Sequence, residues 1–107
     1  MGEFNIKSGD RLPYLRATLV DASGTPVSIA LADSVFFNFK TAPGGTPWSR
    51  AANVIDAPNG VVEYRWQAGD TNQPGEYLAD FSVNFGSEEI TFPNNRNIQI
   101  TIFPEVN

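Results

Sequence analysis

The sequence predicts an all-β domain in which two antiparallel sheets pack face to face. Glycine and proline punctuate the chain, with 9 Gly and 8 Pro among its 107 residues. The segments between these turns are short and rich in β-branched and aromatic residues, and none has the apolar spacing of a helix. Short strands separated by regular turns are typical of sandwiches and barrels. A chain of this length forms one domain, so we expect residues 1–107 to make a single sandwich of about seven to eight strands.

Five segments alternate apolar and polar residues with the period of two that a half-buried strand requires. In chain order, their apolar positions are Leu15, Ala17 and Leu19; Val35, Phe37 and Phe39; Val62, Tyr64 and Trp66; every second residue from Tyr77 to Phe85; and Ile98, Ile100 and Ile102. Each segment therefore presents one apolar face, which two facing antiparallel sheets need in order to enclose a core. Trp66 is the expected large aromatic residue of that core.

The turn at Asn59-Gly60 predicts a first hairpin. This dipeptide favours a type I′ turn, because both central residues of that turn need positive φ. A two-residue loop pairs Ile55 with Tyr64 and Ala57 with Val62, so that apolar residues face one another. The same register places Asp56 opposite Glu63 on the outer face, where two like charges are mildly destabilising.

The turn at Gly86-Ser87 predicts a second hairpin. Glycine at the first central position suits a type II′ turn. The resulting register pairs Val83 with Ile90 and Phe81 with Phe92. Because turn chemistry and burial pattern agree on this register, we expect a long strand followed directly by its hairpin partner.

The segment Gly75-Glu76-Tyr77 follows a turn and opens the longest predicted strand. A tyrosine at this place is typical of the tyrosine corner of immunoglobulin-like sandwiches, in which the phenol hydroxyl bonds to backbone upstream. The chain has no cysteine, so the disulfide of antibody domains is absent. The predicted fold class is therefore an all-β, immunoglobulin-like antiparallel β-sandwich.

The composition leaves little material for catalysis. The chain has no histidine and no cysteine, so the common nucleophile–base pairs cannot be built. Asp70-Thr71-Asn72 has a spacing of oxygen ligands that suits calcium, but the rest of a calcium loop is missing. Asp and Asn side chains that bond to nearby backbone in a turn explain this spacing more simply. We predict that the protein is not an enzyme and has no catalytic, cofactor-binding or metal-binding residues.

The charge balance excludes other classes of partner. Seven basic residues face twelve acidic ones, which gives a formal net charge of −5. Such a chain is not expected to bind nucleic acid or an anionic membrane surface. Its apolar runs are far shorter than the ~18 residues of a membrane helix. The N-terminus lacks the basic start and apolar stretch of a signal peptide, which disfavours a bacterial cell-surface domain.

Several large apolar residues break the alternation or lie in predicted loops. Single exposed apolar residues need no explanation, but several on one surface mark an interface. The interface candidates are Tyr14, Phe36, Trp48, Leu78 and Phe103.

Four stretches carry a resemblance to a known family. They are Ile6-Lys7-Ser8-Gly9-Asp10 continuing through Leu12-Pro13, Leu15–Leu19 and Gly24–Val27; Gly60–Thr71; Pro74–Phe81; and Thr91–Asn95 followed by Ile98–Ile102. Together they resemble the phage baseplate upper protein N-terminal family, whose members are immunoglobulin-like modules. The resemblance implies a virion protein, made in the host cytoplasm, whose partners are other phage structural proteins in a symmetric assembly of several copies. It brings no catalytic residues.

Two hypotheses about function follow. The first is a non-enzymatic bacteriophage structural protein that docks on other tail, baseplate, neck or capsid proteins. The alternative is a receptor- or carbohydrate-binding module in which Trp48, Tyr14 and Trp66 stack on sugars. Exposure of the tryptophans in a groove with polar neighbours would favour the alternative.

Overall fold

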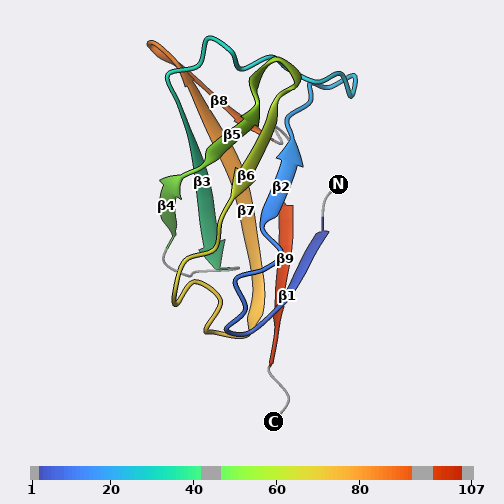
Figure 1. Ribbon diagram of the computed structural model, residues 1–107, viewed down its shortest axis with the longest axis vertical. Coiled ribbons are helices and arrows are strands. Elements are labelled where there is room, and N and C mark those ends of the chain that lie inside the picture. The colour runs from blue at the N-terminus through green and yellow to red at the C-terminus, as the bar shows by residue number, and fades with distance from the viewer. Residues whose placement is uncertain (1–2, 42–46, 93–97, 105–107) are drawn as a thin grey trace.

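The computed structural model describes residues 3–41, 47–92 and 98–104, and these ranges consist mostly of β-strands (Figure 1). Nine strands and one short 3₁₀ helix lie in them, against the about seven to eight strands expected from the turn spacing. The edge strands β1 and β4 are not among the segments that the alternation pattern predicts as strands. The elements are β1 (Glu3–Lys7), β2 (Leu15–Thr18), β3 (Ser34–Thr41), β4 (Trp48–Ala51), β5 (Asn53–Asp56), η1 (Ala57–Asn59), β6 (Val61–Tyr64), β7 (Gly75–Phe85), β8 (Glu88–Phe92) and β9 (Ile98–Phe103).

The strands form a six-stranded sheet and a three-stranded sheet. The larger sheet has the order β1-β9-β7-β3-β4, with β8 also paired to β7, and the smaller has the order β2-β6-β5. Strand β1 runs parallel to β9, and the other described strand pairs are antiparallel. A three-stranded sheet facing a larger sheet built around β3, β7 and β9 is the strand order of immunoglobulin-like sandwiches. The predicted fold class is confirmed, with one parallel pair added.

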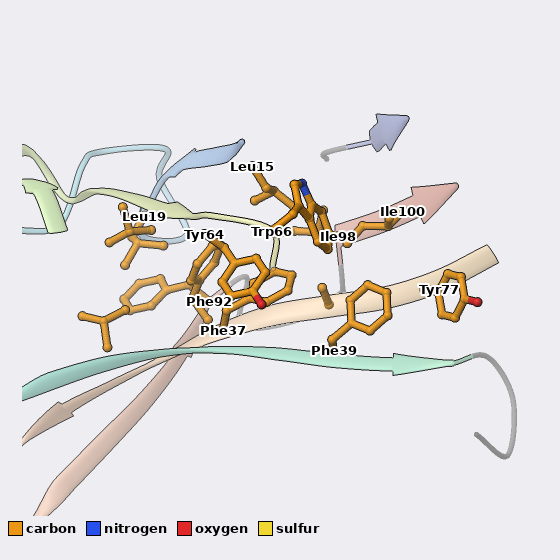
Figure 2. Close-up of a cluster of buried hydrophobic side chains, with 14 of the residues drawn as sticks. Leu15, Leu19, Phe37, Phe39, Tyr64, Trp66, Tyr77, Phe92, Ile98 and Ile100 are labelled. Atoms are coloured by element: carbon orange, nitrogen blue, oxygen red, sulfur yellow. The ribbon is translucent and has the colours of Figure 1, made fainter. Parts of the chain in front are cut away.

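The core lies between the two sheets, where the predicted apolar faces meet (Figure 2). The alternating residues of β3, β7 and β9 are buried against those of β2 and β6. Phe37 stacks on Tyr64 across the sandwich, with ring centroids 4.4 Å apart, and Trp66 meets both rings edge-on. Trp66 is only 3% exposed, so it is the core aromatic that the sequence predicts.

The tyrosine corner is present at the start of β7. The hydroxyl of Tyr77 donates a hydrogen bond of 2.6 Å to the backbone carbonyl of Gln73. This bond fixes the turn that leads into the longest strand, as the sequence predicts.

The two predicted hairpins have opposite outcomes. The β7–β8 hairpin has the predicted register, with Val83 opposite Ile90 and Phe81 opposite Phe92. Gly86 at its turn has a φ of +62°, as a type II′ turn requires at that position.

The predicted register of the first hairpin is wrong. Val62 lies opposite Val54, and β5 and β6 are joined by η1 and a bulge instead of a two-residue turn. The cause is Pro58, which has no N–H to donate to β6 in the predicted pairing. Only Gly60 takes positive φ there, so the type I′ turn does not form.

The predicted placement of Asp56 opposite Glu63 is therefore also wrong. Glu63 lies opposite Asn53 on one side and Arg16 on the other. Its carboxylate accepts hydrogen bonds from Arg16 and Arg65, each at 2.9 Å. The outer face of the small sheet thus carries a carboxylate between two guanidinium groups, and no repulsive pair.

Candidate docking surfaces

Three of the five predicted interface residues lie on the outer face of the six-stranded sheet. Phe36 lies opposite Ser82, Leu78 opposite Gln99, and Phe103 opposite Lys7. Along β7, the positions of Phe36 and Leu78 differ by four residues, or about 13 Å. The three side chains therefore share a face without forming one continuous patch.

The other two predicted interface residues already have aromatic or cationic partners. Trp48 stacks on Phe39 with centroids 4.8 Å apart, and the guanidinium of Arg50 lies 4.6 Å from its ring. The guanidinium of Arg65 lies 5.4 Å from the ring of Tyr14. Trp48 thus belongs to the edge of the core, and Tyr14 belongs to the arginine cluster of the small sheet.

These contacts bear on the stacking residues that the carbohydrate hypothesis requires. Trp66 is buried, and Trp48 is packed between strand β3 and an arginine. A ring that stacks on a sugar needs an open face. The arrangement of the two tryptophans therefore gives this hypothesis no support.

Short polar side chains on the outer face of the large sheet bond to one another. Asn38 donates to Asp80 at 2.7 Å and to Ser82 at 2.6 Å, and it accepts from Ser49 at 2.6 Å. These bonds hold the side chains of three strands in fixed positions. The face between Phe36 and Leu78 is therefore polar, and its side chains bond to one another.

Asp70, the first residue of the possible calcium loop, is fully engaged by protein groups. One carboxylate oxygen accepts a 2.7 Å bond from Arg50. The other accepts bonds from the Tyr64 hydroxyl at 2.5 Å and the Gln67 backbone N–H at 2.8 Å. Burial and this carboxylate raise the pKa of Tyr64 above its ordinary value. Asp70 therefore acts as a structural anchor, and the described ranges hold no group of three or more acidic side chains placed to bind a metal.

One end of the sandwich concentrates the negative charge of the molecule. This acidic end, at the top of Figure 1, comprises the β2–β3 connection, the β5–β6 turn and the β7–β8 hairpin tip. It carries five acidic residues and no basic residue: Asp21, Asp33, Asp56, Glu88 and Glu89. Among the other residues that the structure describes, six acidic residues balance six basic ones, so the acidic end accounts for the net charge of the described part of the chain.

Hydrogen bonds tie the three segments of the acidic end together. Leu19 N–H donates to the carbonyl of Gly60 at 2.8 Å, and Ile29 N–H donates to that of Ala57 at 2.9 Å. The carboxylate of Asp33 accepts from the N–H of Gly86 at 2.7 Å. The segments therefore present one ordered surface.

The acidic end also carries a prominent apolar residue. Leu31 is 87% exposed and lies in a turn closed by a hydrogen bond from Ala32 N–H to the Ile29 carbonyl. Leu31 is not among the interface residues predicted from the sequence. The sequence gives little indication that Leu31 is exposed, because the surrounding segment Ala30–Asp33 could also form one turn of helix.

A shallow apolar groove lies at the opposite end of the molecule. Its volume is about 290 Å³, and it lies where β1 and β9 end beside the connection to β2. Leu12 is 64% exposed and Phe103 46% exposed, which is more than side chains in a packed core retain. The lining residues are Asn5, Ile6, Lys7, Asp10, Leu12, Pro13 and Phe103.

No protein-family model and no curated protein matches this chain. Within the ranges that the structure describes, no helix is long and apolar enough to cross a membrane.

Proposed function

We propose that this protein is a non-enzymatic structural protein of a bacteriophage virion. In this role it is an immunoglobulin-like module that docks on other tail, baseplate, neck or capsid proteins and is present in several copies. The turn-and-strand resemblance in the sequence motivates the virion assignment. The absence of histidine and cysteine from the sequence and the structural role of Asp70 are consistent with a protein that performs no chemistry.

The docking role rests on the concentration of charge and of exposed apolar side chains at the ends of the sandwich. One end bears the net charge of the described residues beside an exposed leucine, and the other bears an apolar groove. Large exposed apolar side chains that gather beside a charged rim are typical of protein–protein interfaces. These features favour assembly with other proteins over existence as a free monomer.

Mass spectrometry of purified phage particles tests this proposal. We expect peptides of this chain at a fixed ratio to the major structural proteins, unchanged by a salt wash that removes loosely bound protein. Cryo-electron microscopy of the same particles would then locate the sandwich at a symmetric position. Absence of the chain from washed particles would refute the proposal and would direct attention to host glycans and surface proteins.

A further inference from the structure

We propose that the chain associates head to tail, with Leu31 of one copy inserted into the Leu12–Phe103 groove of the next. This inference rests on the proposed function, in which the protein assembles in several copies. It names the partner of both ends, which is a second copy of the same chain.

The two surfaces lie at opposite ends of the sandwich. The acidic end includes the hairpin tip that follows the last residue of β7, whereas the groove lies at the level of its first residues, where Ile102 pairs with Gly75 and Phe103 follows. The molecule is 45 Å long along its principal axis. The two surfaces therefore cannot meet within one molecule, so a contact between them must join two copies of the chain.

The groove suits an apolar side chain on a loop. At about 290 Å³ it lies at the lower limit of the size range of small-molecule sites, which is about 300–1,000 Å³. Leu12, Pro13, Ile6 and Phe103 provide its apolar wall. An inserted leucine would bury its own side chain and the exposed parts of Leu12 and Phe103 together.

Charge determines which surfaces can meet. Two acidic ends facing each other would bring ten carboxylates together without a basic residue. The groove instead presents Lys7 and a single acid, Asp10. The exposed Arg11 lies between two lining residues, Asp10 and Leu12, in the sequence. Complementary charge therefore favours the contact between unlike ends.

A contact between unlike ends has a consequence for assembly. Such a heterologous contact leaves one unused surface at each end of every oligomer, so it continues into a ring or an open filament. Both forms are compatible with a protein present in several symmetric copies.

Sedimentation velocity of the full chain, from about 10 μM to about 1 mM, tests the inference. In buffer of low ionic strength we expect the average mass to rise with concentration, and we expect salt to reverse this rise because the contact is partly electrostatic. Leu31→Ser and Leu12→Ser should each weaken association at least about tenfold. Phe103→Ser is a second groove variant, and Phe36→Ser, at an exposed apolar residue outside both surfaces, is the matched control.

A mixing experiment distinguishes this contact from a symmetric dimer. Leu31→Ser keeps an intact groove, and Leu12→Ser keeps an intact Leu31, so an equimolar mixture should form a 1:1 complex that does not grow further. The proposal is overturned if the wild-type chain stays monomeric across the concentration range, if the mixture stays monomeric while the wild type associates, or if Phe36→Ser alone abolishes association.

The outcome of the sedimentation and mixing experiments is independent of the test of the proposed function. A monomeric protein found in washed particles would refute head-to-tail association and leave the virion role standing. A self-associating protein absent from particles would do the reverse.

Discussion

Gly60 occupies a position where a larger residue does not fit. Its φ is +69°, in the left-handed region, and a Cβ placed on it would lie 2.4 Å from the carbonyl oxygen of Val27. Its own carbonyl accepts the N–H of Leu19, which joins the β2–β3 connection to the β5–β6 turn. The backbone of two segments therefore meets at this residue, and only glycine permits that approach.

Substitution of Gly60 by alanine should destabilise the fold by about 3 kcal/mol, because left-handed strain and a clash with fixed backbone add together. Gly24→Ala is the matched control. Gly24 has a φ of +84°, but nothing lies within 4 Å of its added Cβ, so it carries the strain alone. Urea unfolding of both variants measures the difference. Equal losses of stability in the two variants would show that the clash at Gly60 relaxes at no cost.

Asp70 connects the end of β6, the following turn and strand β4. Its side chain is almost fully buried, and Arg50, Tyr64 and the Gln67 backbone N–H all donate to it. Removal of the carboxylate leaves a phenol and a backbone N–H without their acceptor, whereas Arg50 keeps partial access to water.

Replacement of Asp70 by alanine should therefore cost about 3 kcal/mol, the lower end of the range for a broken buried pair. Asn72→Ala, at an exposed residue of the same turn, should stay within about 0.5 kcal/mol of the wild type. Thermal unfolding measures both changes. A loss of stability in Asn72→Ala as large as that in Asp70→Ala would assign the effect to the turn and not to the carboxylate.

At the scale of the elements, the sequence predicts most strands and the face that each of them buries. It predicts the register of one hairpin correctly and that of the other wrongly. The β7–β8 register was predictable because Gly86-Ser87 is flanked by residues that can all donate to the ladder. The β5–β6 register was not, because Pro58 cannot donate, and the resulting 3₁₀ turn shifts the pairing. The sequence also indicates no burial for Glu63, since a charge on an outer face normally meets water.

The small sheet buries Glu63 between Arg16 of β2 and Arg65, the residue that follows β6. Hydrogen bonds from Arg65 and Arg16 lower the pKa of this carboxylate below its ordinary value of 4.5. The folded state thus favours the ionised form more than the unfolded state does. The contribution of this cluster to stability is present above the ordinary pKa and is lost as the pH falls through the lowered pKa.

Glu63→Gln should accordingly lower stability at neutral pH and reduce the loss that the wild type suffers on acidification. Urea unfolding between neutral pH and about pH 3 compares the two slopes. Glu88→Gln, at an exposed hairpin residue, is the control and should keep the wild-type slope. If Glu63→Gln and the wild type lose stability in parallel, the carboxylate does not contribute through its ionisation.

At the scale of the whole molecule, the sequence shows the net charge but not its location. The five acids of the acidic end come from three segments far apart in the chain, so only the folded topology reveals that they share one end. The same holds for Leu31 and for the groove, since each depends on where connections lie. By contrast, Phe36 and Phe103 were predictable as exposed, because each breaks the alternation of a strand.

Crowding five carboxylates at one end should make the stability of the protein depend on salt. The Debye length falls from about 30 Å at 0.01 M to about 3 Å at 1 M, so salt screens repulsion between these exposed groups. The ion pairs of Glu63 and Asp70 have nearly buried carboxylates and are screened less. We therefore expect salt to raise the melting temperature of the dilute, monomeric protein.

Charge reversal at the acidic end should stabilise the protein in the same way as added salt. Glu89→Lys relieves repulsion and should stabilise the protein by about 0.5 kcal/mol, or roughly 2–4 °C at low ionic strength. The same reversal at Glu76, an exposed residue at the other end of β7, should bring no gain, because the basic residues Lys7 and Arg11 lie at that end. Calorimetry of both variants at low and high salt separates the two positions. Equal stabilisation by both variants would mean that total charge, and not its concentration at one end, governs the effect.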